Sequence, residues 1–502
     1  MPSPDLQKRR SGILLHPTSL PSGVLDSDVD RWLQLMADTG FSVWQFLPLG
    51  EPQSGLSPYQ CVSAFAFNPA LLLEFPYIDE TDSSFTEFCN MQKFWLDDYA
   101  LFKVLKLHFN DVAWVDWPER WKFRDPVTMQ KAHEENQHAI ARLKWQQYQL
   151  HKRWQEIRDD AVSRDILLFG DMPIFVAHDS ADVWAHPEWF LLDASGNMSV
   201  VTGVPPDYFS ETGQRWGNPH YDWDTMREDG FAWWKSRLQH HLELFDLVRI
   251  DHFRGLEAAW VIDADCDTAV DGHWQKIPGD ELLASLKESM QDDEGHLPFV
   301  AEDLGVITPE VTRLKKKYKL PGMSILQFSF DEFEDNPHKP QNIKEDTVVY
   351  TGTHDNDTTK GWFNSLEEHV KNYVLATLNL PMIDDVDIDA FYAGDQGDDK
   401  SAGDDKSLDR SSCWFENVDV ADIVVERMID NAMLSRAYIC IIPVQDCLHL
   451  GSEARMNTPG TTTGNWTWQF QWEQIADQHD NNRMKKMRLR NEKTQRFVEP
   501  NS

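Results

Sequence analysis

Charged side chains stand at the end of an apolar, strand-like run in this sequence. The stretch LVRIDHFRG, residues 247–255, places Arg249 and Asp251 where a buried strand would finish, with a second arginine, Arg254, close behind. An unpaired charge inside a core costs several kcal/mol or is neutralised, so these charges need a partner or a task. Two interpretations of these charges are open at this point. One is a structural ion pair between Arg249 and a neighbouring acid, and the other is a functional site.

Three other apolar runs end in the same way. ILLFGDMPIF carries Asp171, PFVAEDL carries Glu302 followed by Asp303, and VVYTGTHD ends in His354 and Asp355. Two carboxylates that flank a bond are what glycoside chemistry requires, because one attacks the anomeric carbon and the other protonates the leaving oxygen. Carboxylate clusters also bind magnesium, so a metal-dependent enolase-like or phosphoryl-transfer site is a rival interpretation. Neither a lysine base nor a phosphate-cradling glycine loop supports that rival.

The elements that would position these residues form a regular series. Eight short apolar runs lie at residues 12–16, 42–48, 166–175, 247–253, 298–304, 323–328, 348–355 and 438–446. Near-continuous apolar strands are typical of a parallel sheet covered on both faces, and helix-like stretches between them fit crossover connections. The sequence therefore predicts an α/β fold, a (β/α)8 TIM barrel with inserted subdomains, whose active site lies at the carboxyl ends of the strands. An open doubly wound sheet is disfavoured, because no glycine-rich dinucleotide turn follows an early strand.

The spacing of the runs also predicts the domain organisation. We expect a single catalytic domain over residues 11–475, with a helical subdomain at 49–165 inserted between strands 2 and 3. A further insertion would lie at 176–246, between strands 3 and 4. The acidic stretch 383–410, in which GDDKS occurs twice, is typical of a solvated, disordered insertion.

Composition limits the class of partner. The chain has 502 residues with 47 basic and 83 acidic side chains, a formal charge of -36 that would repel nucleic acid and anionic membranes. No secretory apolar segment and no membrane-spanning run is evident, so we expect a cytoplasmic protein. The six cysteines show no zinc or disulfide pattern. The 21 tryptophans offer flat apolar surfaces that suit sugar rings, although most should pack in the core.

Several motifs together resemble a known family. GDMPIFVAHDSADVW, LVRIDHFRG, VAEDLG and YTGTHDNDT resemble the four signature regions of the α-amylase clan. With GILLHPTSLPSG, SPYQ, ETGQRWGNPHYDW, LPGMSILQF and SEARMNTPGT, the wording resembles the 4-α-glucanotransferases, the amylomaltase or disproportionating-enzyme family. The resemblance runs from about residue 11 to about residue 470.

This resemblance implies a function. It implies transfer of α-1,4-glucan segments between maltooligosaccharides or glucans derived from starch or glycogen, with glucose as an acceptor, by retaining double displacement. It implies no organic cofactor and no metal. One alternative is an α-glucan hydrolase of the same clan. The other is a non-catalytic glucan-binding protein, but such a protein would have no reason to keep Asp251, Glu302 and Asp355 together. The oligomeric state is left open.

The resemblance also implies roles for individual residues. Asp251 would be the nucleophile, Glu302 the general acid/base, and Asp355 the third acid that orients the sugar and stabilises the transition state. Arg249 shares its side of the strand with Asp251, so we expect it to keep that carboxylate ionised. Glu302 must start protonated, so its pKa should be raised by apolar surroundings and neighbouring acids.

Other positions would bind substrate. Asp171 and His354 match residues that line the sugar subsite next to the nucleophile, and Tyr59 in SPYQ matches an aromatic at its floor. A satisfied histidine at a strand end and ordinary packing of the tyrosine are the alternatives. Asp303 follows Glu302 directly, so it should face the other side of the strand as a structural partner.

The stretch PPDYFSETGQRWG resembles the family's loop over the cleft. In this loop, residues 205–217, Gly213 and Gly217 would act as hinges, while Tyr208 and Trp216 would hold a glucan and exclude water. A rigid loop without a gating role is the alternative. The chain departs from its relatives at Leu56, where they carry an acid, and in NWTWQF, which replaces an arginine-rich ending.

Overall fold

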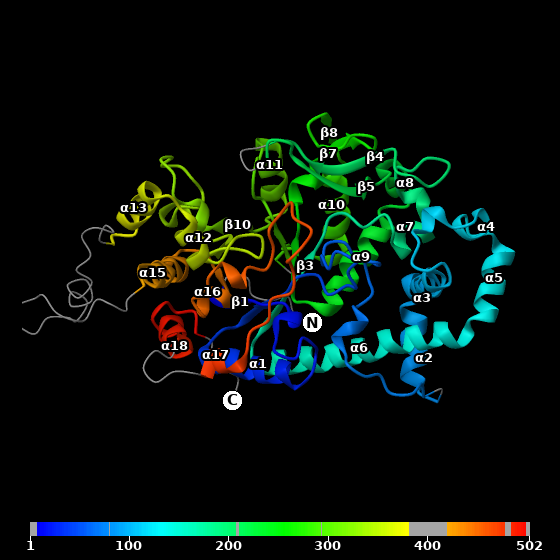
Figure 1. Ribbon diagram of the computed structural model, residues 1–502, viewed down its shortest axis with the longest axis horizontal. Coiled ribbons are helices and arrows are strands. Elements are labelled where there is room, and N and C mark those ends of the chain that lie inside the picture. The colour runs from blue at the N-terminus through cyan, green and yellow to red at the C-terminus, as the bar shows by residue number, and fades with distance from the viewer. Residues whose placement is uncertain are drawn as a thin grey trace, which may run out of the picture.

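The computed structural model describes residues 8–79, 81–206, 210–292, 294–380, 419–476 and 483–497. The acidic insertion predicted at 383–410 lies outside these residues, and so does Tyr208. An eight-stranded parallel sheet occupies the centre of the molecule in the order β10-β11-β12-β1-β2-β3-β6-β9 (Figure 1). Its strands are β1 (Arg10–Leu14), β2 (Val43–Gln45), β3 (Leu167–Met172), β6 (Leu247–Ile250), β9 (Phe299–Ala301), β10 (Gly322–Ile325), β11 (Thr347–Tyr350) and β12 (Ile439–Pro443).

The two outer strands of this order meet and close the sheet. The amide of Ala301 at the end of β9 donates to the carbonyl of Pro321, just before β10, at 2.8 Å. The amide of Met323 in β10 donates to Oδ1 of Asp303 at 2.8 Å. Each of the eight runs expected from the sequence overlaps one of these strands, so the predicted TIM-barrel fold is confirmed.

Side chains of the strands alternate between the barrel interior and the surrounding helices. An interior cluster takes one side chain or more from every strand, and it includes Leu14, Val43, Phe169, Leu247, Val300, Met323, Val348 and Ile439. Counting by two from three of these residues reaches the charged positions: Asp171 from Phe169, Arg249 and Asp251 from Leu247, and Glu302 from Val300. Because side chains alternate along a strand, these four residues lie on the inward side, at the carboxyl ends of their strands.

Helices surround the barrel and extend to one side of it. Figure 1 shows α2 to α6 gathered on one side, within the range proposed for the helical subdomain. Among the described residues, no helix has the length and apolar character needed to cross a bilayer. The α-helices are α1 (Ser27–Thr39), α2 (Ser83–Met91), α3 (Lys93–His108), α4 (Glu119–Lys122), α5 (Pro126–Glu135), α6 (Gln137–Ser163), α7 (Ala181–Ala185), α8 (Trp223–Glu228), α9 (Ala232–Leu244), α10 (Gly279–Met290), α11 (Pro309–Lys317), α12 (Thr359–Ser365), α13 (Glu368–Thr377), α15 (Val420–Leu434), α16 (Val444–Cys447), α17 (Trp472–Ala476) and α18 (Arg483–Lys493).

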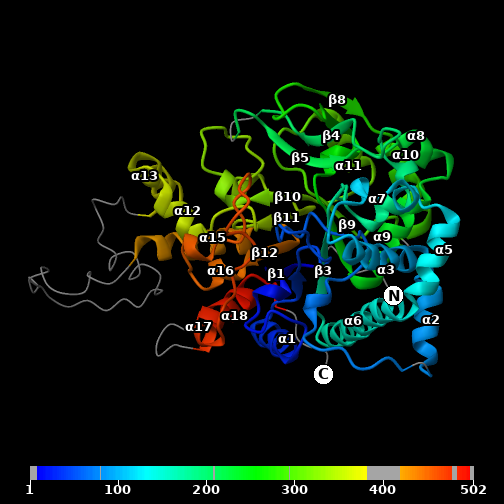
Figure 2. The same ribbon diagram turned by 45° about the vertical axis from the view of Figure 1, so that its right-hand side comes forward.

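A second, antiparallel sheet was not predicted from the sequence. It has the order β5-β4-β7-β8 and lies beside one end of the barrel (Figure 2). Its strands are β4 (Val200–Val204), β5 (Gln214–Pro219), β7 (Ala258–Asp263) and β8 (Gly272–Lys276). The last four residues of the predicted loop 205–217 begin β5, so this segment is partly strand. QRWGNP has no apolar alternation, so this strand depends on its pairing with β4, the strand that precedes it.

Candidate active site

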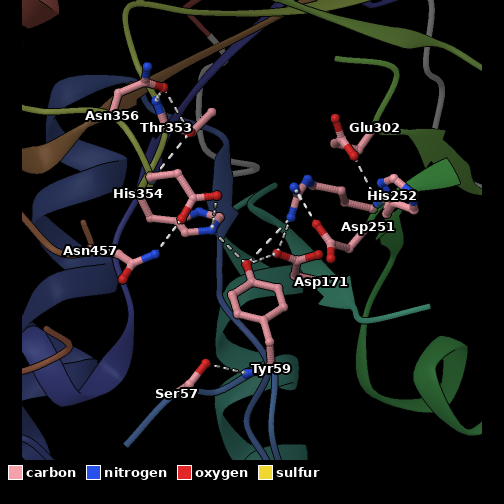
Figure 3. Close-up of polar contacts among 12 residues, drawn as sticks. Ser57, Tyr59, Asp171, Asp251, His252, Glu302, Thr353, His354, Asn356 and Asn457 are labelled. Carbon is pink, nitrogen blue, oxygen red and sulfur yellow. Dashed lines mark hydrogen bonds and ion pairs between the residues drawn. The ribbon is translucent and has the colours of Figure 1, made fainter. Parts of the chain in front are cut away.

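Asp251 and Glu302 occupy matching positions at the ends of neighbouring parallel strands. Ile250 of β6 pairs with Ala301 of β9, and the two acids are the next residue on each strand. The amide of Glu302 donates to the carbonyl of Ile250 at 3.1 Å, which continues the pairing to the acids themselves. Figure 3 shows the two carboxyl side chains in one group with Asp171, Tyr59 and the other labelled residues.

Arg249 links two of the acids. Its Nη1 donates to Oδ2 of Asp171 at 2.5 Å, and its Nη2 donates to Oδ1 of Asp251 at 2.7 Å. Asp171 and Arg249 are also register partners on β3 and β6. Both side chains are buried, so this arginine is a fixed cation between two carboxylates, as expected for a strand that carries charge at its end.

The surroundings of Asp251 push its pKa in two directions. Burial raises the pKa of Asp251 to about 6, against the opposing effect of the Arg249 guanidinium. The side chain keeps 28% exposure, so it can be reached from solvent. The effect of Arg249 has the sign expected from the sequence, but burial, which was not expected, outweighs it. Asp251 is still mostly ionised at pH 7.

Glu302 is held in a different environment. Burial raises the pKa of Glu302 to about 7; Arg249 opposes this, while the Asp251 carboxylate adds to it. Its Oε2 accepts from the amide of His252 at 2.8 Å, and its Oε1 accepts from the amide of Leu304 at 2.8 Å. The raised pKa expected for a group that starts protonated is therefore present, and two backbone amides fix the carboxyl group.

Tyr59 joins Asp171 to His354. Its hydroxyl donates to Oδ2 of Asp171 at 2.7 Å and lies 2.8 Å from Nε2 of His354. The rings of Tyr59 and His354 stack at 5.4 Å with an interplanar angle of 18°. Because the tyrosine hydroxyl donates its own proton to Asp171, its oxygen must accept a proton from His354. We therefore assign to His354 the tautomer that carries its proton on Nε2. Burial lowers the pKa of His354, which favours this neutral form.

Asp355 lies at the open side of the group, with 48% of its side chain exposed. Its Oδ1 accepts from Nδ2 of Asn457 at 2.6 Å, and its Oδ2 lies 3.4 Å from Nε2 of His354. Nη2 of Arg455 donates to the backbone carbonyl of Asp355 at 2.8 Å. Sequence analysis did not assign Asn457, although it lies in the motif SEARMNTPGT.

Aromatic side chains border the group on two sides. The ring of Trp216 meets that of His252 edge-on at 4.8 Å, which places it beside the residue that follows Asp251. Trp466 lies 6.0 Å from the rings of both Tyr59 and His354 and has a left-handed backbone, with φ of 64°. Sequence analysis marked NWTWQF only as a departure and missed this contact; the clustering of tryptophans was the available signal.

Asp303 points away from the acids and holds structure, as predicted. Its carboxylate forms an ion pair with Lys315 of α11 and accepts from the amide of Met323 in β10. It therefore fastens the seam between β9 and β10.

The polar groups of this site do not suggest a metal centre. Within the described part of the chain, no three or more His, Cys, Asp or Glu side chains are arranged to hold a metal ion. Carboxylate oxygens of Asp171 and Asp251 already bond to the guanidinium of Arg249, which supplies the positive charge between them. This donor set does not favour the magnesium-dependent interpretation.

Comparison with known proteins identifies the family. The profile that describes 4-alpha-glucanotransferases matches residues 15–75 and 74–475. A 4-alpha-glucanotransferase of Thermus thermophilus is 40% identical over 94% of this chain and 96% of its own length. The chain belongs to the 4-α-glucanotransferase family. Another family member, from Synechocystis sp., is 38% identical over 94% of this chain and 96% of its own length.

The fold of the family agrees with this assignment. The structure of amylomaltase from Streptococcus agalactiae in complex with acarbose superposes with a TM-score of 0.83 at 30% identity, covering 98% of this chain and all of that chain. The prediction of a transferase that acts on α-1,4-glucans is thereby confirmed, and the hydrolase alternative is not supported.

Proposed function

We propose that the chain transfers α-1,4-glucan segments by retaining double displacement, with Asp251 as nucleophile and Glu302 as general acid/base. Glu302 gives its proton to the glycosidic oxygen while the Asp251 carboxylate bonds to the anomeric carbon and the glycosidic bond breaks. The released glucan leaves. A glucan 4-hydroxyl then attacks the same carbon, Glu302 takes its proton, and the bond to Asp251 breaks.

The observation that carries this proposal is the pairing of two unlike carboxyl groups at neighbouring strand ends. Adjacent strands lie about 4.8 Å apart, close to the separation of roughly 5 Å that retaining glycosidases use between their two carboxyl groups. Asp251 is bonded to a cation and partly open to the cleft. Glu302 is buried against backbone amides with a pKa near 7. Two carboxyl groups in such different surroundings suit a nucleophile and an acid.

The remaining residues would bind the sugar at the cleavage point. We assign Tyr59 to the floor of this subsite, with Asp171 and His354 at its sides. Asp355 would hold ring hydroxyls and stabilise the distorted, positively charged sugar of the transition state. Its exposure leaves the carboxylate accessible, and the hydrogen bond from Asn457 fixes its direction.

Transfer rather than hydrolysis requires that water be kept from the glycosyl intermediate. We assign this task to the segment 205–217, with Tyr208 and Trp216 as the aromatic residues that contact the acceptor glucan. Trp216 already packs beside the residue that follows the nucleophile. A covered cleft favours a bound 4-hydroxyl over bulk water.

The donors in this proposal are maltooligosaccharides and glucans derived from starch or glycogen. Glucose and maltooligosaccharides serve as acceptors, and the proposed location is the cytoplasm. Relatives in Solanum tuberosum and Arabidopsis thaliana are named as chloroplastic or amyloplastic enzymes.

Incubation with maltotriose in the presence of a chelator tests the activity. We expect free glucose together with a ladder of longer maltooligosaccharides, at a constant total of reducing ends. Reducing ends that rise without longer products would indicate a hydrolase, and an unchanged substrate would indicate a binding protein.

A further inference from the structure

Arg254, the second arginine of LVRIDHFRG, is a buried cation that the mechanism above does not use. Arg254 is only 7% exposed, and its Nε has no hydrogen-bond partner. None of the ion pairs among the described residues includes it. Buried arginines are ordinarily paired with acids, so this position must be held by other contacts.

Two contacts hold the guanidinium. Nη1 of Arg254 donates to the backbone carbonyl of Val306. The guanidinium carbon also lies 3.7 Å from the centre of the Trp274 ring, on β8 of the second sheet. A cation over an aromatic face is attracted to it, and a planar guanidinium stacks there better than an ammonium group.

The bond to Val306 completes a series of hydrogen bonds between the two chain segments that carry the proposed catalytic acids. The amide of His252 donates to Oε2 of Glu302 at 2.8 Å. The amide of Phe253 donates to the carbonyl of Glu302 at 3.1 Å. The bond from Arg254 to Val306 is the last hydrogen bond of this series. The segment after Asp251 is thus fastened to the segment after β9 at three successive positions.

The turn 303–308, which contains Val306, is open to solvent. Val306 is 67% exposed, and Gly305 before it has a left-handed φ of 78°. The same turn supplies the amide of Leu304 that bonds to Oε1 of Glu302. Movement of the turn would therefore displace one of the two donors that fix the Glu302 carboxyl group.

The second sheet contacts this region at two points. Trp216 of β5 packs against His252, and Trp274 of β8 packs against Arg254. Strands at the two edges of the sheet therefore hold both ends of the short segment 252–254.

We propose that Arg254 is a positioning residue that, held by Trp274, fixes the turn 303–308 and so keeps Glu302 aligned for proton transfer. This inference rests on the proposed function, because it takes Glu302 as the general acid/base. It predicts a selective defect: steps that need a proton moved by Glu302 slow down, whereas attack by Asp251 does not.

The test compares donors with different leaving groups in the variants Arg254→Gln and Trp274→Leu. Maltotriose needs a proton on its leaving oxygen. With α-maltosyl fluoride, the Asp251 carboxylate bonds to the anomeric carbon while the carbon–fluorine bond breaks and fluoride departs without a proton. We expect Arg254→Gln to lose roughly 10- to 100-fold in kcat/KM for maltotriose. The first-turnover release of fluoride should stay near the wild-type rate.

Azide supplies a second readout, because it attacks the glycosyl intermediate without a base. We expect added azide to restore steady-state turnover of α-maltosyl fluoride in Arg254→Gln and, to a smaller extent, in Trp274→Leu. Arg254→Lys keeps the charge but stacks poorly, so its loss should be intermediate. Trp472→Leu, which removes a separate stack with Arg31 at 3.9 Å, is the matched control and should behave as wild type.

Glu302→Gln, measured in parallel, separates the two proposals. If Glu302→Gln lacks the donor-selective, azide-rescued pattern, the proposed role of Glu302 is wrong. If Glu302→Gln has the pattern and the Arg254 variants lose both donors equally, or lose neither, only the role of Arg254 is overturned. Circular dichroism and unfolding midpoints verify that each variant is folded, and Trp274→Leu carries the test if Arg254→Gln is not.

Discussion

Asp251 and Glu302 directly follow two residues that pair across neighbouring strands, so the strand register alone sets these acids side by side. Their environments then differentiate them. Asp251 bonds to Arg249 and is partly exposed, whereas Glu302 is buried and bonds to the amides of His252 and Leu304. One pair of strands therefore provides both the spacing and the difference in protonation that a retaining transferase requires.

The pH dependence of kcat/KM should reflect both groups. In the proposed mechanism the active form has Asp251 ionised and Glu302 protonated. Because the pKa of Asp251 is raised to about 6, activity should rise as the pH passes that value, and because that of Glu302 is raised to about 7, it should fall above it. The two limbs belong to the interacting pair, so we expect a narrow bell with its maximum between them. Initial rates with maltotriose across the pH range measure this, and an alkaline limb far above 7 would contradict the assignment.

Asn457 should matter for the orientation of Asp355. Its amide donates to the carboxylate at 2.6 Å, so Asn457→Ala removes a donor and Asn457→Asp sets a like charge in its place. We expect kcat for maltotriose to fall about 10-fold in the alanine variant and further in the aspartate variant, with a smaller change in KM. Full activity of Asn457→Asp would show that this contact does not serve Asp355.

Ion pairs of Glu426 should stabilise the docking of α18 on α15. Burial pulls the pKa of Glu426 up, but His449 and Arg490 hold it well below its usual value. A depressed pKa contributes stability that is present above the unfolded value of 4.5 and is lost as the pH falls. Glu426→Gln should therefore lower the free energy of unfolding by about 2–4 kcal/mol at pH 7.

Urea unfolding at two pH values checks this expectation. The difference between Glu426→Gln and the wild type should shrink at a pH below the usual value of a glutamate, whereas the exposed Glu332→Gln should change little at either pH. A difference that stays constant with pH would mean that packing, and not charge, accounts for the effect.

Leu56 carries a local cost that can be removed. Its φ is 59°, in the left-handed region, and its side chain is 51% exposed. A branched apolar residue is disfavoured there, whereas asparagine and aspartate adopt this conformation readily. Leu56→Asn should raise the free energy of unfolding by about 1 kcal/mol. Leu73→Asn, at an exposed leucine of ordinary φ, should give no such gain; equal effects of the two changes would argue against backbone strain.

The barrel strands were predictable because each is buried on both faces. Runs such as those of β3, β6 and β11 are nearly continuous in apolar residues, and the acids at their ends break that pattern where a TIM barrel places its site. The family resemblance then added roles that spacing could not supply.

The features that were missed depend on long-range contacts. β5 and β8 are mostly polar and partly exposed, and the sheet that includes them is completed by the distant pairing of β4 with β7. Asn457 and Trp466 reach the site only because the segment after β12 folds back over it, more than a hundred residues from Asp355 or Glu302 in sequence. Arg254 was visible at once, but its partners are set by two distant segments, Val306 by the turn after β9 and Trp274 by β8.

Trapping the covalent intermediate tests the central claim most directly. Glu302→Gln would be mixed with α-maltosyl fluoride, which forms the intermediate without acid catalysis and lets it accumulate because no base activates the acceptor. Mass spectrometry of the protein and its peptides should find one maltosyl group attached to Asp251 within residues 247–255, and none in the double variant that also carries Asp251→Asn. Fluoride release without an adduct, or an adduct on Asp355 or any other residue, would contradict the assignment of Asp251 as nucleophile.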